Sequence, residues 1–282
     1  MSFLEFRTQK VTEKITRIFA VSGEMAYLVE GEERAALIDT GSGIGSMRAK
    51  VDELTDKPVT VLLTHGHVDH AMGAGEFEEV WMNHEDDYIF REHGQRQFRV
   101  DGLSMMVPPF EATEEDLLPT PDYTKFHDLK EGMRFDLGGI SVEMFACPGH
   151  TLGSLVMLIP EERILMTGDA CNTFTFLFDS YSTSVEEYEE NLKILLPKVE
   201  GKYDRVLLSH GDGNGYPEII QDVIAVCEDI KMGRTADLPF SFMGKPAGVI
   251  AKPIDYMSNP EIKPYGNIVY NKGRIWKSQL NG

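Results

Sequence analysis

Residue types that bind metal ions are concentrated in one short segment of the sequence, THGHVDH at positions 64–70. Within six residues it places three imidazoles and one carboxylate, those of His65, His67, His70 and Asp69. Imidazole and carboxylate groups are the usual ligands of zinc and of non-haem iron. Because the segment follows an apolar run, a turn from strand to helix can direct these side chains at one position. The segment therefore predicts a metal site.

Three more candidate ligands lie far away in the sequence but in matching contexts. His150 in CPGHT, Asp169 in TGDA and His210 in LSHG each follow a predicted strand and have a glycine neighbour. Taken alone, a histidine after a strand is more often a solvated turn residue or a hydrogen-bonded core residue. Five of the eight histidines and two aspartates share these contexts, however. That favours one metal site built from several strand ends.

The predicted strands and helices that position these residues alternate along the sequence as in a layered α/β fold. Apolar and β-branched runs predict strands at 15–21, 25–29, 34–38, 59–63, 133–137, 140–146, 154–159, 163–166 and 205–208. Helices are predicted at 44–54, 85–93, 184–196 and 217–231, and a closing hairpin from 267–270 and 274–276. Ser184 and Glu187 have the spacing of a capping box. No repeat or linker interrupts the pattern, so one domain over 1–282 is expected.

Two parts of the chain lie outside this regular pattern. From about 85 to 128 we expect a lid-like insertion, in which Met105, Met106 and Phe110 would form an adaptable apolar wall over the metal edge. From about 212 to 282 we expect a C-terminal extension made of a helix and a hairpin. Among the remaining histidines, His93 is expected on a solvated helix face.

The net charge indicates which binding partners to exclude, and the cysteines indicate the cellular compartment. The chain has 27 Lys and Arg against 46 Asp and Glu, a formal net charge of −19. Such an acidic protein repels phosphate backbones and anionic lipid, so neither nucleic acid nor membrane is expected as a partner. The three cysteines show no ligand spacing and predict reduced thiols, hence the cytoplasm. No apolar run is long enough for a signal peptide or a membrane span.

The motifs HxHxDH, PGHT, GD and SHG occur here in the order in which they occur in the metallo-β-lactamase superfamily, which the sequence resembles over about 12–211. The resemblance implies an α/β fold, the four-layer αββα metallo-β-lactamase sandwich, with a binuclear metal site along one edge. It assigns the first metal to His65, His67 and His150, the second to Asp69, His70 and His210, and the bridge to Asp169. Asp39, in the segment IDTG, would orient a ligand without binding metal.

The same resemblance argues against some activities of the superfamily. The dominant type of metallo-β-lactamase has a Cys ligand where this chain has Asp169, so antibiotic hydrolysis is not expected. Diiron oxygen reductases carry a carboxylate where this chain has His67. The tRNA-processing nucleases need a basic surface, which a net charge of −19 does not supply.

The expected activity is metal-dependent hydrolysis of an ester, thioester or lactone in a small-molecule substrate, as in the glyoxalase-II-like and lactonase-like enzymes. Two Zn²⁺ ions, with Fe or Mn as alternatives, would hold a metal-bridging hydroxide, and Asp69 and Asp169 would be the catalytic carboxylates. A rival interpretation is an iron-dependent oxidoreductase similar to the persulfide dioxygenases. A third is a metal-binding protein without catalysis.

Residues that could contact the substrate are less clearly marked. Acyl-homoserine lactonases have a Tyr three residues after the bridging Asp, where this chain has Asn172. The aromatic run from Phe174 to Phe178, which ends near Tyr181, has the alternation of a strand. Asn172, Phe174 and Tyr181 could line the substrate pocket, while the aromatic run could equally pack in the core or in a homodimer interface. The sequence leaves these alternatives open.

Overall fold

The structure is a computed structural model that describes residues 5–103, 112–255, 263 and 265–280. Within this part of the chain the first sheet has seven strands in sequence order, antiparallel from β1 to β4 and parallel from β4 to β7. Its strands are β1 (Arg7–Lys10), β2 (Ile15–Phe19), β3 (Met25–Glu30), β4 (Ala35–Ile38), β5 (Val59–Leu62), β6 (Glu79–Met82) and β7 (His127–Asp128).

The second sheet has the order β13-β11-β10-β9-β8. It is antiparallel except between β11 and β13, which run parallel. Its strands are β8 (Arg134–Asp136), β9 (Ser141–Ala146), β10 (Leu155–Ile159), β11 (Ile164–Gly168) and β13 (Arg205–Leu208). Every strand predicted for the two sheets is therefore present, with ends that differ by up to two residues.

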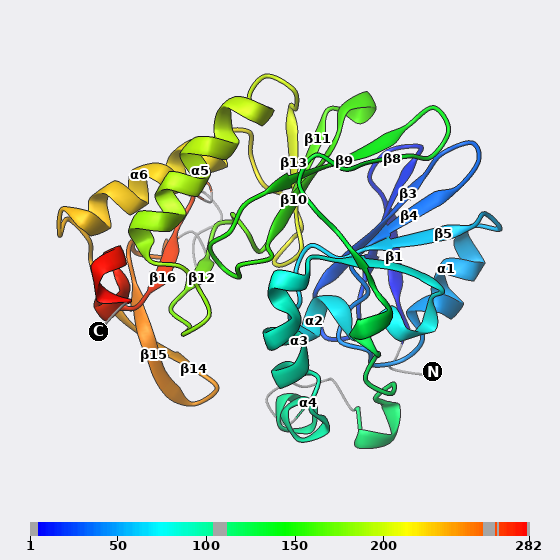
Figure 1. Ribbon diagram of the computed structural model, residues 1–282, viewed down its shortest axis with the longest axis horizontal. Coiled ribbons are helices and arrows are strands. Elements are labelled where there is room, and N and C mark those ends of the chain that lie inside the picture. Colours follow the sequence, from blue (N-terminus) through cyan, green and yellow to red (C-terminus); the bar gives the residue numbers. More distant parts are fainter. Residues whose placement is uncertain (1–4, 104–111, 256–262, 264, 281–282) are drawn as a thin grey trace.

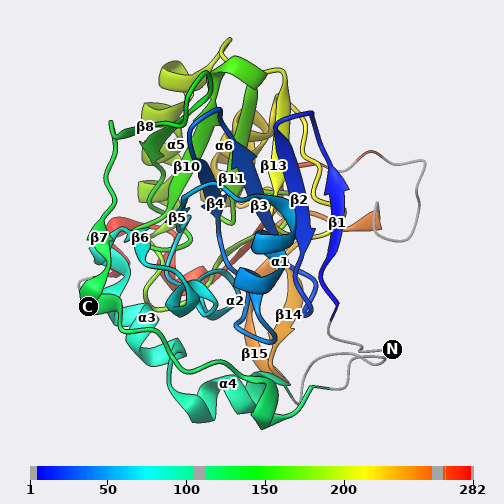
Figure 2. The ribbon, with the colours of Figure 1, turned by 90° about the vertical axis from the view of Figure 1, so that its right-hand side faces the viewer.

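Helices cover the outer face of each sheet, which gives four layers (Figures 1 and 2). The first sheet carries α1 (Met47–Leu54), α2 (Val68–Ala71) and α3 (Asp87–His93), and the second carries α5 (Val185–Val199) and α6 (Ile219–Lys231). α4 (Arg96–Leu103) lies beyond α3, away from the strands. One apolar core lies between the two sheets, and a further core lies under each helical layer. The predicted αββα sandwich is confirmed.

Local signals explain where two of the helices begin. Ser46 caps α1, because its hydroxyl accepts a hydrogen bond from the Ala49 N–H at 3.0 Å. The helix consequently begins at Met47, three residues later than the sequence predicted. The capping box expected for α5 is present, with the Ser184 hydroxyl and the Glu187 carboxylate each accepting from the other's backbone N–H.

A third, smaller sheet corrects the prediction for the C-terminal region. Its order is β12-β16-β15-β14, from β12 (Thr175–Leu177), β14 (Leu238–Phe242), β15 (Lys245–Ile250) and β16 (Ile268–Tyr270). The predicted hairpin of 267–270 with 274–276 is wrong, because β16 pairs with β12 and β15 while Lys272–Arg274 forms a 3-10 turn. The β14–β15 hairpin was not predicted because Pro239 and Pro246 lie in its strands, and proline is rare inside strands.

The segment 85–128 contains more regular structure than its sequence suggested. Besides α3 it forms α4, which the sequence analysis did not identify, and the edge strand β7. Leu117 pairs with Ile44 in an isolated antiparallel bridge, which attaches the segment to the loop after β4. Met105, Met106 and Phe110 lie outside the described residues. No helix in the described ranges is long and apolar enough to cross a membrane.

Candidate metal centre

Two groups of potential metal ligands lie at one edge of the sandwich. The first comprises His65, His67 and His150, and the second comprises Asp69, His70, Asp169 and His210. Within each group the candidate ligand atoms lie within 4.8 Å of one another. The structure therefore brings together all seven residues that the sequence analysis selected as ligands.

Strand ends position these side chains. The first four candidate ligands follow β5, and the others follow β9, β11 and β13. The turn after β11 needs a glycine: Gly168 has φ +52°, and a Cβ there would lie 3.1 Å from Thr64, the residue before His65. Without a side chain at Gly168, the loops carrying Asp169 and His65 can pack directly against each other.

The spacing of the first group suits a metal ion. Nε2 of His65 and Nε2 of His150 lie 3.1 Å and 2.9 Å from Nδ1 of His67. Nitrogen ligands at roughly 2.0–2.1 Å from a tetrahedral zinc ion are about 3.3 Å apart. The three rings are almost completely buried. Burial, reinforced by the neighbouring imidazoles, lowers the pKa of His65 and His67 well below the usual value, so both rings are neutral and able to bind metal.

The second group combines two imidazoles with two carboxylates. Nε2 of His210 lies 3.1 Å from Oδ2 of Asp169 and 3.4 Å from Oδ2 of Asp69. Nε2 of His70 lies 3.4 Å from the Asp69 carboxylate and 3.5 Å from that of Asp169. Burial opposes ionisation of the two aspartates, but the charged imidazoles outweigh it and lower the pKa of both carboxyls. The group thus offers ionised oxygens, the form that binds metal.

Polar atoms without partners mark the same place. In the second group, Nε2 of His70 and Oδ1 of Asp169 are buried and make no hydrogen bond. Leaving buried polar atoms unpaired costs free energy, and most such atoms in proteins have a partner. Two such atoms within one group of metal-ligand residues fit a divalent metal ion as the missing partner.

Asp39 holds His70 in place, as expected from the segment IDTG. Its Oδ2 lies 2.8 Å from Nδ1 of His70, which leaves Nε2 facing the carboxylates. The same carboxylate accepts hydrogen bonds from the backbone N–H and the hydroxyl of Thr64. Asp39 is buried and adopts a left-handed backbone with φ +61°. A buried carboxylate that orients an imidazole is a common support for metal ligands.

His150 is oriented by two contacts that the sequence did not reveal. Its Nδ1–H donates to the carbonyl oxygen of Phe176 at 2.7 Å, and its own carbonyl accepts from the Ser182 hydroxyl at 2.9 Å. The first bond fixes the ring with Nε2 toward His67. β12 and the loop after it therefore support a candidate ligand, although neither supplies one.

Asp86 is a further residue that sequence reasoning missed. Its carboxylate accepts from the Gly66 N–H at 2.8 Å, the Gly153 N–H at 2.7 Å and the Thr151 hydroxyl at 2.8 Å. It is fully buried, and a Cβ at either glycine would collide with it. Asp86 thus joins the turn of His65 and His67 to the loop of His150. Acidic neighbours on both sides of it in the sequence conceal this role.

The prediction of a solvated His93 is wrong. Its ring stacks on His67, with centroids 4.9 Å apart, and on Phe98, with centroids 4.3 Å apart. Burial lowers the pKa of His93 to about 4. The helical spacing explains the error, because His93 lies four residues after buried Ile89 and three after buried Phe90, on the same face of α3.

The predicted substrate residues have different surroundings. Tyr181 lies against the first group, with its ring centroid 5.3 Å from that of His67. Asn172 stabilises a turn, since its Oδ1 accepts from the Phe174 N–H at 2.7 Å. Phe174 packs against Phe176 and Phe240 in an aromatic cluster of the third sheet. Contact between substrate and any of the three stays a prediction.

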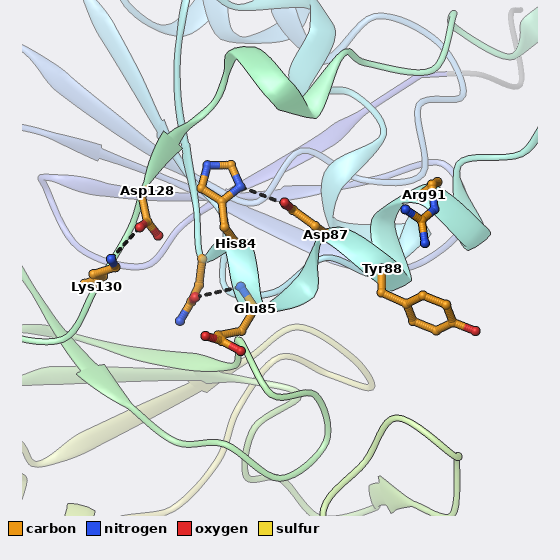
Figure 3. Close-up of a pocket in the computed structure, with 8 residues that line it drawn as sticks. His84, Glu85, Asp87, Tyr88, Arg91, Asp128 and Lys130 are labelled. Carbon is orange, nitrogen blue, oxygen red and sulfur yellow. Dashed lines mark hydrogen bonds and ion pairs between the residues drawn. The ribbon is translucent and has the colours of Figure 1, made fainter.

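A separate hollow of about 420 Å³ lies beside α3 and β7, and Figure 3 shows its lining. None of the seven candidate ligands lines it. His84 points toward Asp87, with 2.7 Å between Nδ1 and Oδ1, and Asp128 pairs with Lys130 at 2.5 Å. The cations and anions drawn there largely neutralise one another, and the hollow is distinct from the metal centre.

Comparisons with known proteins agree with this geometry. The Metallo-beta-lactamase superfamily matches residues 21–210. Hydroxyacylglutathione hydrolase GloC of Haemophilus influenzae is 28% identical over 161 residues, which cover 55% of this chain and 70% of that protein. Acyl-coenzyme A thioesterase MBLAC2 of Gallus gallus is 28% identical over 207 residues, which cover 68% and 74%.

Solved structures support the fold. A metallo-β-lactamase from Pontibacter korlensis has a TM-score of 0.55 at 18% identity, covering 78% of this chain and 98% of that one. The superfamily protein ST1585 from Sulfolobus tokodaii has a TM-score of 0.56 at 20% identity, covering 82% and 90%. The family match includes all seven candidate ligands and every strand of the two main sheets except β1 and β2. This chain belongs to the metallo-β-lactamase superfamily.

Proposed function

We propose that the chain is a binuclear metal-dependent hydrolase that cleaves a thioester bond in a small molecule. The position of Asp169 carries the proposal. Its Oδ2 lies 3.1 Å from Nε2 of His210 in the second group and 3.9 Å from Nε2 of His150 in the first. One carboxylate within reach of both groups is what a ligand shared by two metal ions requires.

The roles of the other residues follow from their positions. His65, His67 and His150 would hold one ion, Asp69, His70 and His210 the other, and Asp169 both. Two divalent ions, zinc in this proposal, supply Lewis acidity and a hydroxide nucleophile at neutral pH when bound. Asp39 keeps Nε2 of His70 directed at the site, and the Phe176 carbonyl does the same for His150.

The described cysteines do not offer a rival nucleophile. Cys147, Cys171 and Cys227 are all buried and unpaired. Burial raises the pKa of Cys171 to about 12 and raises the pKa of the other two thiols well above the usual value. Because the thiolate is the reactive form, thiols of this kind are inert. This supports hydrolysis without a covalent cysteine intermediate.

The relatives favour thioesters among the bonds considered. Both hydroxyacylglutathione hydrolase GloC and the acyl-coenzyme A thioesterase MBLAC2 are named for thioester substrates. Both are hydrolases, which supports a metallo-hydrolase over the iron-dependent oxidoreductase. Lactones and oxygen esters use the same carbonyl chemistry and remain part of the test.

A substrate panel on protein with quantified metal content tests the proposal. Acyl thioesters, oxygen esters and lactones would be supplied to the wild type and to Asp169→Ala. We expect thioester hydrolysis by the wild type with two equivalents of metal, and loss of both metal and turnover in the variant. Two metals and a normal rate in Asp169→Ala would contradict the shared ligand. One equivalent of iron together with oxygen consumption would favour the oxidoreductase.

A further inference from the structure

A small apolar pocket lies beside the second group of ligands. It encloses about 80 Å³, and Asp69 forms part of its lining. Its apolar surface comes from Ile44, Val68, Phe98, Gly102, Leu103 and Leu117. Sites for whole ligands usually measure roughly 300–1,000 Å³. This pocket therefore has room for one arm of a substrate and not for a complete molecule.

The wall of the pocket is continuous with the first group of ligands. Phe98 stacks almost parallel on His93, with an angle of 10° between the rings, and His93 stacks on His67. On the other side, Val68 and Asp69 belong to the helix that follows His67. A group held in the pocket thus lies next to Asp69 of the second set, and the stacked rings of Phe98 and His93 connect the pocket wall to His67 of the first.

Backbone interactions keep the pocket open. Arg99, in α4 and only 5% exposed, donates from Nη1 to the carbonyl of Leu118 at 2.7 Å. From Nη2 it donates to the carbonyls of Ser42 and Gly43 at 3.3 and 3.4 Å. These bonds tie α4 to the two loops that carry Ile44 and Leu117. A pocket held in this way needs little reorganisation to accept a ligand.

We propose that this pocket binds an unbranched aliphatic arm of the substrate's acyl group while the scissile carbonyl lies at the metal centre. This inference rests on the proposed thioester hydrolysis and names the acyl chain that the site selects. The lining is apolar apart from Asp69, Arg99 and two serines. An aliphatic chain gains free energy by leaving water for such a surface, whereas a charged chain loses its hydration there.

Gly102 is a lining residue at which the size of the pocket can be changed. It lines the pocket from α4, and a Cβ added to it would meet no atom of the described residues within 4 Å. A larger side chain at position 102 therefore enters empty space without displacing the backbone. Its φ lies outside the left-handed region, so other residues fit the helix at this position. Because Gly102 lines the pocket, we expect Gly102→Leu to reduce the pocket volume and to leave the hydrogen bonds of Arg99 in place.

The test compares kcat/KM for acyl thioesters of one small thiol, from acetyl to decanoyl, at equal metal occupancy. For the wild type we expect hexanoyl to exceed acetyl by at least about tenfold, since one methylene in an apolar pocket is worth roughly 10–200-fold. Gly102→Leu should lower that hexanoyl-to-acetyl ratio by about tenfold, and Gly102→Ala by less. Gln97→Leu, an exposed change on the same helix, should leave the ratio unaltered.

Calorimetry with hexanoate and acetate and the metal-loaded protein measures binding of the aliphatic chain independently of thioester hydrolysis. The wild type should bind hexanoate more tightly than acetate, and Gly102→Leu should lose that preference. If the wild type and Gly102→Leu are both active and prefer the same acyl-chain lengths, the proposed binding of the acyl chain in this pocket is wrong and the proposed hydrolysis stands. Absence of all turnover with an intact hexanoate preference would overturn the proposed hydrolysis alone. Absence of both would overturn the two together.

Discussion

His93 illustrates how a single side chain links the metal centre to its surroundings. The ring lies between His67 and Phe98, and its Nδ1 is buried without a hydrogen-bond partner. An imidazolium in this place would be a buried charge facing neutral rings, which is costly. Burial accordingly lowers the pKa of His93 to about 4, against roughly 6.5 in the unfolded chain.

This shift predicts a specific dependence of stability on pH. As the pH falls below 6.5 the unfolded chain takes up a proton that the folded protein resists until about pH 4, so stability decreases over that range. Between pH 7.5 and 5 the loss is about 2 kcal/mol for this one residue. His93→Phe keeps an aromatic ring in the stack and should remove the loss. Denaturant unfolding of both metal-loaded proteins at several pH values measures the difference.

The metal content of both proteins is measured at each pH, so that loss of metal is separated from protonation of His93. Parallel stability profiles for the two proteins would show that the folded state protonates His93 readily, and the buried stack would then be wrong.

At the scale of elements, Asp86 joins two loops that carry the first group of ligands, in which His67 and His150 lie 83 residues apart in the sequence. An asparagine there has one acceptor oxygen and an NH₂ group that cannot accept, so at least one of the N–H donors of Gly66 and Gly153 would lose its partner. The cost of such a buried donor is about 1–3 kcal/mol. Lost support of this kind usually weakens metal binding roughly 10–100-fold.

Asp86→Asn should therefore weaken the ion held by the three histidines and leave the other ion nearly unaffected. Competition with a chelator, followed for each equivalent of metal, measures the two affinities. Asp87→Asn is the matched control, because Asp87 is adjacent and partly exposed and its carboxylate contacts His84 at the surface. Equal weakening of both ions, or the same effect in the control, would contradict this role for Asp86.

The strands differ in how well the sequence predicts them. Strands buried in the sandwich were predictable because their apolar runs are continuous, as in β10, where all five residues are buried. The β14–β15 hairpin was not, because it is mostly exposed and contains two prolines. Its turn at Met243 and Gly244 has positive φ at both residues, a conformation for which a methionine gives no signal.

For the molecule as a whole, all seven candidate ligands could be selected from sequence because each lies beside a glycine or within one dense motif at a strand end. The residues that hold these ligands in place could not be selected from the sequence. Asp86, the Phe176 carbonyl and the Arg99 hydrogen bonds depend on contacts between segments distant in sequence. The cytoplasmic location and the extent of the single domain stay predictions, although the three cysteines are indeed unpaired.

The central claim is that two metal ions held at one edge of the sandwich make this chain a hydrolase. The most direct measurement is a titration of metal-free protein with Zn²⁺ while thioester hydrolysis and bound metal are followed together. We expect no hydrolysis without metal, a rate that reaches its plateau at two equivalents, and no loss of rate on thiol alkylation of the loaded protein. Hydrolysis that persists without metal, or a plateau at one equivalent, would contradict it.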